Sequence, residues 1–312
     1  MKILHITPAY FPAYRYGGPI KSVHELNKWL TKSGAEVTVY TTNIDGPNKL
    51  DVPAGQPVDR DGVKVFYFKA SFPRFWFYSK SLRRALREIA GDFDFIYITS
   101  VFFAASALGG YYARKFQKPY IMSPRGSLML ETLKKKWLKK KFYLSLLEKN
   151  NLAKAAAVHF TTEQEKEEYL EAGLAFKKAI VVPNGLGTED LNLEVARGVF
   201  REKFNIRPDK KIILFLSRLS WKKGLDTLIP AFARVIKDEP KAVLVLAGGD
   251  DENYAKEIKK LIEIEKLKTN ISINQFENQH PSLLKRGGGS VPYDVIFTGM
   301  LSGIEKVSAY KD

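Results

Sequence analysis

Arg218 and Lys223 are two cationic side chains in a short polar stretch that separates two apolar segments. The apolar residues 212–216 predict a buried strand, and the residues after Gly224 repeat apolar side chains at helical spacing. A helix N-terminus attracts anions because its N–H groups are free and carry a partial positive charge. A guanidinium can chelate two oxygen atoms, and an ammonium adds a point charge. The pattern therefore predicts a diphosphate site, with a solvated basic loop as the alternative.

A glycine-containing loop follows the first predicted strand, residues 3–6. Gly17 and Gly18 allow positive φ angles and a close approach of the backbone to a ligand. Pro19 suits the first turn of a helix, and apolar residues at helical spacing follow it. The order is again strand, loop and helix, an arrangement that lets a ligand approach the loop backbone. On its own, a pair of glycines is more often a plain turn.

Segments typical of strands alternate with segments typical of helices along most of the chain. The predicted strands are residues 3–6, 36–42, 63–68, 94–99, 119–126 with a closing turn, 156–161, 179–185, 211–216 and 242–248. This alternation predicts an α/β fold whose parallel sheets are covered by helices on both faces. Ligands bind beyond the carboxyl ends of such strands. Four residues follow such ends: Gly17, Arg125, Thr162 and Asn184.

Composition limits the function classes. The 312 residues are 45% hydrophobic and 27% charged, which suits two α/β domains with substantial cores. The absence of cysteine excludes disulfides and thiolate metal sites, and the four histidines show no metal-ligand pattern. We find no signal peptide and no apolar run that could span a bilayer, so we expect a cytoplasmic protein. The net charge of +16 predicts anionic partners: nucleotide-sugar phosphates, anionic lipids or nucleic acid.

The alternating pattern weakens between residues 186 and 208, where we expect an interdomain linker. The first predicted domain is residues 1–185, and the second is residues 209–312. Within the second domain, residues 269–293 have an atypical composition that includes Gly-Gly-Gly-Ser at 287–290, a sequence typical of flexible linkers. We expect an inserted loop there, or an artificial junction.

The string from Arg218 to Ile229 resembles the signature Arg-Leu-x-x-x-Lys-Gly-x-x-x-Leu-Ile of the family-4, group 1 glycosyltransferases. This family has the GT-B fold, in which two Rossmann-like domains face a cleft. The resemblance implies that Arg218 and Lys223 bind the donor diphosphate and act as the catalytic cations. It also implies that the loop of Gly17 and Gly18 faces the donor phosphates. The remaining predicted donor-binding residues follow two strand-like segments of the second domain: Gly248 and Gly299.

The implied activity is transfer of a sugar from a nucleotide diphosphate sugar, with retention at the anomeric carbon. We expect the acceptor to be a polysaccharide or a lipid-linked glycan. Arg125 and Asn184 are candidate acceptor contacts, with a surface salt bridge and a turn as the respective alternatives. Arg125 cannot serve as a general base because a guanidinium does not deprotonate. In retaining relatives the leaving phosphate is thought to assist the acceptor hydroxyl, so we expect no metal and no cofactor.

Two departures from the family pattern affect the second domain. Residues 269–293 stand where relatives have a short turn. The family's acidic motif, two glutamates eight positions apart that bind the donor sugar and ribose, is not found before residue 312, and neither is the helix that braces the first domain. We therefore expect an incomplete second domain. The alternative function is a catalytically impaired remnant that binds nucleotide or membrane without transferring sugar.

Two basic, aromatic stretches are candidates for membrane contact. Residues 133–147 are expected to form a helix with Leu133, Trp137, Leu144 and Leu147 on one face and lysines around it. The other stretch, residues 72–84, mixes aromatic side chains with arginines. The predicted contacts with an anionic membrane, on its inner face, are Lys134, Trp137, Lys140 and Trp76. The alternative is ordinary core packing, and we expect no nucleic-acid partner because no such motif is present.

Overall fold

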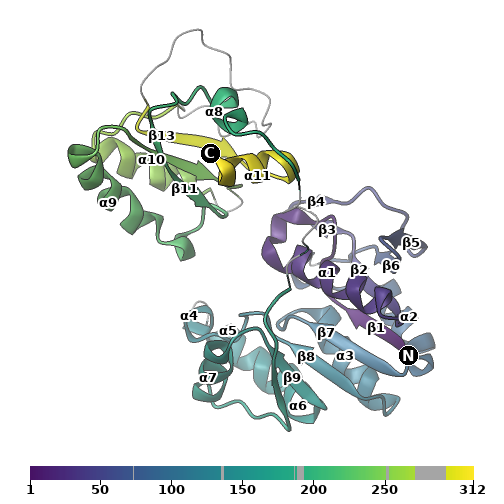
Figure 1. The fold of residues 1–312 in the computed structure, drawn as a ribbon. Coiled ribbons are helices and arrows are strands. Elements are labelled where there is room, and N and C mark those ends of the chain that lie inside the picture. The colour runs from purple at the N-terminus through teal and green to yellow at the C-terminus, as the bar shows by residue number, and fades with distance from the viewer. Residues whose placement is uncertain (73, 135–136, 186, 188–192, 251–252, 271–292) are drawn as a thin grey trace. The chain divides into compact units, whose positions relative to one another are not determined.

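The computed structural model describes residues 1–312 except 73, 135–136, 186, 188–192, 251–252 and 271–292. The chain divides into two compact units, unit 1 from Met1 to Leu186 and unit 2 from Gly187 to Asp312 (Figure 1). Each unit contains a parallel ladder of strands with helices packed against it, so the predicted α/β fold class is confirmed. The predicted insertion at 269–293 lies almost entirely outside the described residues and stays a prediction.

The sheet of unit 1 has eight strands among the described residues. In spatial order they are β10 (Ala179–Val181), β9 (Ala157–Phe160), β8 (Tyr120–Ser123), β7 (Phe95–Thr99), β1 (Lys2–Ile6), β2 (Glu36–Thr42), β6 (Val63–Phe68) and β5 (Pro57–Arg60). Neighbouring strands are parallel except β5 and β6, which form an antiparallel hairpin. A separate small hairpin pairs β3 (Ile44–Asp45) with β4 (Asn48–Lys49). All carboxyl ends of the parallel strands therefore lie at one edge.

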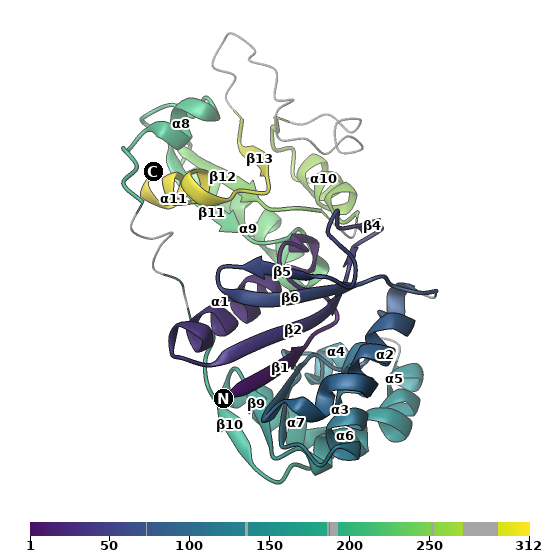
Figure 2. The same cartoon turned by 90° about the vertical axis from the view of Figure 1, so that its right-hand side faces the viewer.

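Helices cover both faces of this sheet because side chains alternate across each strand. Leu4 and Ile6 of β1 point to the face that carries α2, α3, α6 and α7, whereas Ile3 packs with Val23 of α1 on the other face. Figure 2 shows α1 on the opposite side of the sheet from α2 and α3. The bounds are α1 (Gly18–Lys32), α2 (Lys80–Ile89), α3 (Ala104–Lys115), α6 (Lys149–Lys154) and α7 (Glu163–Glu171), with the short helices η1 (Tyr14–Tyr16), η2 (Arg74–Trp76) and η3 (Ala90–Asp92).

The described residues of the segment predicted as one helix over 133–147 lie in helical stretches. They are α4 (Leu130–Lys134), α5 (Trp137–Tyr143) and η4 (Leu144–Glu148), and η4 has the wide turns of a π-helix. The prediction of a single apolar face is wrong, because Leu133 and Leu144 pack against the core of unit 1 while Trp137 is 52% exposed. Helical spacing indicates which side chains share a face, but packing against the rest of unit 1 decides which of them are buried. The exposed apolar side chains are instead Trp137, Leu138, Phe142, Leu146 and Leu147.

The aromatic stretch around η2 also differs from its predicted surface. Trp76 is half-buried, and its Nε1 donates a hydrogen bond to the hydroxyl of Tyr143 at 3.1 Å. Phe72 and Phe75 are 92% and 80% exposed. The surface that this stretch offers to solvent is therefore formed mainly by the two phenylalanines, while Trp76 joins η2 to α5.

Unit 2 is a smaller layered structure of the same kind. Its described strands, β11 (Lys211–Leu216), β12 (Ala242–Ala247) and β13 (Val295–Gly299), pair in parallel in that order. Ile229 and Phe232 of α9 (Leu225–Asp238) pack on one face with α10 (Ala255–Ile264). The other face is covered by α8 (Val199–Lys203) and α11 (Gly303–Lys311). A short helix, η5 (Trp221–Lys223), lies between β11 and α9.

Part of the segment predicted as a linker belongs to unit 2. Phe200 of α8 and Ile206 are buried against Val243 and Ile296 of its sheet. The carboxylate of Asp312 accepts hydrogen bonds from the backbone N–H groups of Gly198 and Arg201, which ties α8 to the end of α11. Periodicity cannot reveal such a short helix, because five residues contain barely one repeat of the pattern.

The backbone passes very closely at Gly248, directly after β12. A Cβ atom at this position would lie 1.8 Å from the carbonyl oxygen of Ser217, which follows β11. At the next residue, Gly249, an added Cβ would meet no atom within 4 Å. Only a residue without a side chain fits at Gly248, so this glycine permits the close approach of the loops after β11 and β12.

Glu148 is a titratable side chain buried at the end of η4. Its Oε2 accepts a hydrogen bond from Asn151 Nδ2 at 3.0 Å, whereas its Oε1 has no partner among the described residues. Burial disfavours the charged form of a carboxyl group, and it raises the pKa of Glu148 to about 7. The folded state therefore favours the protonated acid.

Replacing Gly248 with Ala should destabilise unit 2 by about 3 kcal/mol, because the new methyl group forces two backbone segments apart. The matched control is Gly249→Ala, which meets open space and should change stability by less than about 0.5 kcal/mol. Thermal unfolding of the two variants beside the wild type gives the comparison. Equal melting temperatures for both variants would contradict the close crossing at Gly248.

Replacing Glu148 with Gln should remove a pH dependence of stability. The raised folded-state pKa means that Glu148 contributes stability below about pH 4.5 and loses it as pH rises to about 7. The lost contribution is about 3 kcal/mol. The melting temperature of the wild type relative to Glu148→Gln should therefore fall between pH 5 and pH 8. Glu131→Gln, at an exposed position of α4, serves as the control and should show a constant difference.

Candidate functional site

Three loops meet at the carboxyl edge of the sheet in unit 2. The backbone N–H of Leu219 donates to the carbonyl of Gly249 at 2.9 Å, and that of Gly248 donates to the carbonyl of Gly299 at 2.8 Å. These bonds join the loop that carries Arg218 to the two glycines predicted at the donor site. The structure therefore brings Arg218, Gly248 and Gly299 onto neighbouring loops.

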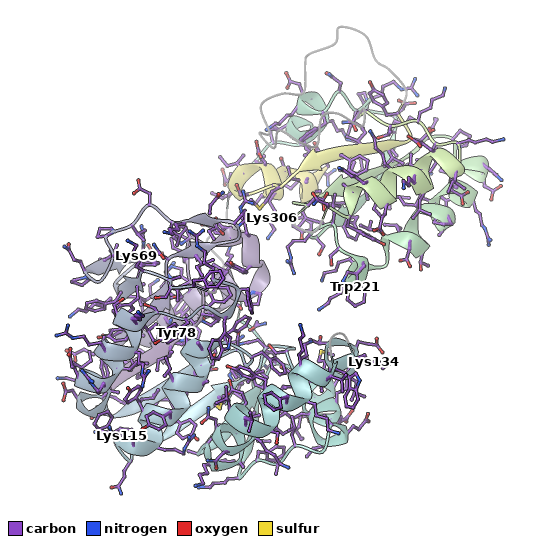
Figure 3. All side chains as sticks on the ribbon, turned by 180° about the vertical axis from the view of Figure 1, so that it is seen from behind. Lys69, Tyr78, Lys115, Lys134, Trp221 and Lys306 are labelled. Atoms are coloured by element: carbon purple, nitrogen blue, oxygen red, sulfur yellow. The ribbon has the colours of Figure 1, made fainter. Side chains whose placement is uncertain are left out.

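Arg218 and Lys223 are unpaired cations at this edge. Arg218 is half-buried and Lys223 is exposed, and neither side chain forms a hydrogen bond or an ion pair with the described residues. By contrast, the Nζ atom of Lys222 lies 5.5 Å over the ring of Trp221. Figure 3 shows the side chain of Trp221 projecting from this loop. Gly224 has a left-handed backbone with φ of 69°, and no side chain caps the α9 N-terminus that it precedes. Two cations and a free helix end together suit an anionic ligand.

The predicted glycine loop of unit 1 leads from β1 into α1. Gly17 has φ of 75° and ψ of −148°, a conformation that requires glycine, and Gly18 begins the helix. No side chain caps this helix end. The hydroxyl of Tyr16 accepts a hydrogen bond from the backbone N–H of Gly46 at 2.9 Å, which fixes the loop to the β3–β4 hairpin.

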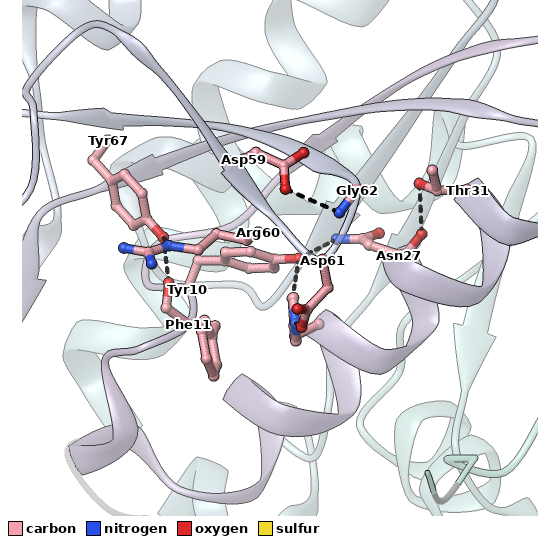
Figure 4. A network of polar contacts seen from close by, with 10 residues as sticks. Tyr10, Phe11, Asn27, Thr31, Asp59, Arg60, Asp61, Gly62 and Tyr67 are labelled. Atoms are coloured by element: carbon pink, nitrogen blue, oxygen red, sulfur yellow. Dashed lines mark hydrogen bonds and ion pairs between the residues drawn. The ribbon is translucent and has the colours of Figure 1, made fainter. Parts of the chain in front are cut away.

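A buried network of polar side chains holds this loop in place (Figure 4). Asp61 lies 2.8 Å from Nε2 of His24, whose Nδ1 lies 2.9 Å from the hydroxyl of Tyr10. The hydrogen bond to His24 lowers the pKa of Asp61. Asn27 Nδ2 also donates to the Tyr10 hydroxyl, at 3.2 Å. The hydroxyl of Tyr67 donates to the backbone carbonyl that follows Tyr10, so the β5–β6 hairpin holds the loop on its other side. The sequence alone gave no signal for this network, because its members are far apart in the chain.

His5 extends the polar network across the sheet. Its Nδ1 lies 2.7 Å from Asn27 Oδ1, and its Nε2 lies 2.8 Å from the hydroxyl of Thr99. Burial lowers the pKa of His5 to about 4, so the ring is neutral near pH 7. Because the amide oxygen can only accept, Nδ1 carries the proton and Nε2 accepts from Thr99. His5 thus has a structural role in joining β1, α1 and β7.

The predicted acceptor residues meet at the carboxyl ends of β8 and β10. The Nη1 group of Arg125 donates a hydrogen bond to the amide oxygen of Asn184. Arg125 has φ of 54°, a left-handed conformation that is uncommon for a residue with a side chain. Its Nε atom is buried and has no partner among the described residues. The structure therefore brings Arg125 and Asn184 together at the edge where the sequence predicts ligands to bind.

Glu165 is a residue of this edge that the sequence analysis missed. Its Oε1 accepts from the N–H of Gly126 at 2.5 Å, and its Oε2 accepts from both the N–H and the hydroxyl of Thr161, at 2.8 and 2.9 Å. The hydroxyl of Thr162 in turn accepts from the N–H of Glu165 at 3.0 Å. The spacing of Thr162 and Glu165 is that of a capping box, a signal that could have revealed this carboxylate. By accepting the hydrogen bond from Gly126, the Glu165 carboxylate fixes the turn that contains Arg125.

Tyr97 and His159 lie beside Arg125 on the face of the sheet that carries α1. The hydroxyl of Tyr97 bonds to Nδ1 of His159, whose Nε2 lies 2.9 Å from the carbonyl oxygen of Val182. Burial lowers the pKa of His159, which makes the ring neutral near pH 7. Since a carbonyl can only accept, Nε2 carries the proton and Tyr97 donates to Nδ1. This cluster was not anticipated from the sequence.

The described residues show neither a metal-binding cluster nor a helix that could span a membrane. They contain no group of three or more histidine, aspartate or glutamate side chains placed to hold a metal ion. Over the same part of the chain, every helix is too short or too polar to cross a bilayer.

Two family profiles match this chain. The profile of the glycosyl transferase 4-like domain matches residues 17–185, and the profile of glycosyl transferases group 1 matches residues 197–291. The first match starts at Gly17 and ends at Gly185, so it contains both Arg125 and Asn184. The second contains Arg218, Lys223 and Gly248.

Curated relatives include the alpha-monoglucosyldiacylglycerol synthase of Streptococcus pneumoniae, which is 26% identical over 318 residues. That match covers 100% of this chain and 64% of the synthase. An uncharacterised glycosyltransferase of Methanocaldococcus jannaschii is 24% identical over 273 residues, which cover 83% of this chain and 66% of the relative. The chain therefore spans just under two thirds of the length of these relatives.

Solved structures with the same fold include Anabaena Alr3699/HepE in complex with UDP-glucose, with a TM-score of 0.64 and 17% identity over 98% of this chain and 71% of that chain. Trehalose-6-phosphate synthase OtsA gives a TM-score of 0.61 at 12% identity, over 99% of this chain and 76% of that chain. These similarities confirm the predicted GT-B fold with two Rossmann-like domains. Because the first family profile alone covers more than half of the chain, this protein belongs to the group 1 glycosyltransferases, with a glycosyltransferase 4-like amino-terminal domain.

Proposed function

We propose that this protein transfers a sugar from a nucleotide diphosphate sugar to a glycan acceptor. The observation that carries the proposal is the pair of unpaired cations, Arg218 and Lys223, on a loop that meets Gly248 and Gly299 at the carboxyl edge of unit 2. Membership of the group 1 glycosyltransferases supports this activity, and the related fold of HepE is known in complex with UDP-glucose.

In the proposed complex, Arg218 and Lys223 bind the donor diphosphate. A guanidinium forms two parallel hydrogen bonds with a phosphate, and the ammonium adds a second positive charge. The uncapped N-terminus of α9 supplies free N–H groups next to them. In unit 1, the N-terminus of α1 that follows Gly17 is uncapped in the same way. The backbone N–H groups of these helix ends are fixed before a ligand arrives, so little free energy is spent on ordering them.

We further propose that the reaction proceeds with retention and without a metal or cofactor. The bond between the anomeric carbon and the diphosphate oxygen breaks, and the acceptor hydroxyl oxygen bonds to the same face of that carbon. The hydroxyl proton passes to the leaving diphosphate. Arg218 and Lys223 stabilise the charge that develops on the leaving group, the kind of electrostatic effect that often dominates a rate enhancement. Arg125 and Asn184 contact the acceptor.

The proposed acceptor is a lipid-linked glycan on the inner face of an anionic membrane. The name of the Streptococcus pneumoniae relative, a glucosyldiacylglycerol synthase, supports a lipid acceptor. So does an exposed surface that we call the α5 patch, formed by Trp137, Leu138, Phe142 and Leu146. The exposed lysines around it are Lys134, Lys139 and Lys141, and Lys141 Nζ lies 5.0 Å over the ring of Trp137. Lys140, by contrast, donates to the carbonyl of Thr132.

Replacing Arg218 with Ala should weaken binding of UDP by about 10- to 150-fold, because one charge-assisted contact is worth about 1.5–3 kcal/mol. Lys223→Ala should weaken it in the same direction. The matched control is Lys222→Ala, whose side chain stacks on Trp221 instead. Calorimetric titration of each variant with UDP measures the effect.

The same titrations with UDP can also contradict the proposal. UDP affinity that is indifferent to Arg218 and Lys223 would mean that these residues do not form the donor site. Assays of sugar transfer from UDP-glucose with the same variants then separate binding from catalysis. Wild-type protein that binds UDP but transfers no sugar from any nucleotide sugar would retain the site and reject the proposed reaction.

Replacing Leu138 and Phe142 together with Ser should reduce binding to vesicles that contain phosphatidylglycerol by at least about tenfold, since burying such side chains supplies about 1.5–3 kcal/mol each. The control is Leu170→Ser, which changes an exposed leucine of α7 outside the patch. Vesicle sedimentation gives both affinities. Unchanged sedimentation of the double variant would reject the α5 patch as the membrane contact.

A further inference from the structure

Arg125 is a cation without a counter-ion among the described residues. Its Nη1 group donates to Asn184, whose amide oxygen is neutral. Its Nε atom is buried and has no hydrogen-bond partner in that part of the chain. Leaving a buried donor unpaired costs about 1–3 kcal/mol, and more for a charged group. The Nε donor of Arg125 therefore needs a hydrogen-bond acceptor, and the described residues do not provide one.

The carboxylate of Glu165, which binds the residue after Arg125, already has hydrogen-bond partners. Its two oxygens accept three hydrogen bonds, from the N–H of Gly126 and from the N–H and hydroxyl of Thr161. No ion pair joins Glu165 to Arg125 within the described residues. Glu165 therefore holds the turn in place and leaves the fork of the guanidinium open.

The other neighbours of Arg125 are neutral. Burial lowers the pKa of His5 and of His159, and the positive charge of Arg125 lowers both further. Burial raises the pKa of Tyr97, and Arg125 opposes that rise. Because the charge of Arg125 contributes to the pKa shifts of His5, Tyr97 and His159, all three side chains lie within its electrostatic reach. None of the three can supply a negative charge near pH 7.

A second unpaired donor lies beside Arg125. Ser123, at the end of β8, is fully buried, and its hydroxyl has no hydrogen-bond partner among the described residues. Burial raises the pKa of Tyr97, and Ser123 and Arg125 both oppose that rise, so both side chains lie near its hydroxyl. The left-handed backbone of Arg125, costing about 1–2 kcal/mol for a residue with a side chain, directs the guanidinium into this position.

We propose that Arg125, Ser123 and Asn184 form a subsite for an oxyanion, a phosphate or carboxylate group carried by one of the substrates. The three residues are named the oxyanion subsite here. An arginine fork matches the two oxygens of either group, and the serine hydroxyl donates a further hydrogen bond. This inference rests on the proposed function and adds that the enzyme selects a negatively charged sugar or acceptor.

The test uses the full chain with Arg218→Ala as the background, so that the predicted diphosphate site does not contribute. The probes are inorganic phosphate, glucuronate and glucose, where glucose is the neutral counterpart of glucuronate. Calorimetric titrations should show at least about tenfold tighter binding of phosphate or glucuronate than of glucose, equivalent to 1.4 kcal/mol. The probe that binds more tightly identifies whether the group is a phosphate or a carboxylate.

Adding Arg125→Gln should abolish that preference while leaving the affinity of glucose unchanged. If Arg125→Gln does not fold, Arg125→Lys decides the question. A lysine keeps the charge but loses the fork, and it should weaken anion binding by about tenfold. Ser123→Ala should weaken it by a smaller factor, and Lys222→Ala should have no effect. A preference that survives both substitutions at Arg125 would overturn the subsite, and so would equal binding of all three probes.

Failure of this inference is distinguishable from failure of the proposed function. UDP binding that requires Arg218, together with no preference for anions at Arg125, would reject only the oxyanion subsite. An anion preference that depends on Arg125, in a protein that does not bind UDP, would reject the proposed donor site and keep the subsite.

Discussion

Parallel pairing of strands decides where the polar side chains of this protein gather. When neighbouring strands run in one direction, their carboxyl ends and the loops that follow lie along one edge of the sheet. In unit 1 this edge collects the Gly17 loop, Arg125 and Asn184, which are far apart in the chain. In unit 2 the same rule places the loop of Arg218 beside the loop of Gly248, and the two are joined by the hydrogen bond from Leu219 N–H to the carbonyl of Gly249. Each candidate site is thus a consequence of strand direction.

The loops at these edges are held by groups that are themselves fully bonded. Glu165 fixes the turn at Gly126, directly after Arg125, and the hydrogen-bonded series from Asp61 through His24 to Tyr10 fixes the loop before Gly17. Buried polar groups are costly unless they are paired, so a paired network has one stable geometry. Arg125 and Arg218 have no ion-pair partner among the described residues, in contrast to these satisfied groups. Pre-formed supports of this kind lower the cost of ordering a site when a ligand binds.

Much of the fold could be predicted from local pattern, because buried parallel strands are short apolar runs bounded by turns. The run before Arg218 and the strand before Arg125 illustrate this. What the pattern could not predict was the surface of residues 133–147. There Leu133 and Leu144 pack against the core, while Trp137 is exposed. Helical spacing indicates which side chains share a face, but packing against other elements decides which of them are buried. Trp76 was also unpredictable, because its partner Tyr143 lies 67 positions away.

The sequence by itself determined the family, the α/β class and the residue types at the strand ends, because these depend on short-range pattern and on one specific motif around Arg218 and Lys223. Only the tertiary structure decided which side chains are paired and which are free. The carboxylate of Glu165 and the histidines near Arg125 lie on other strands and helices, and their burial and hydrogen bonds follow from packing. Pairing depends on distance in space, and residues dozens of positions apart reach that distance only when the sheet forms.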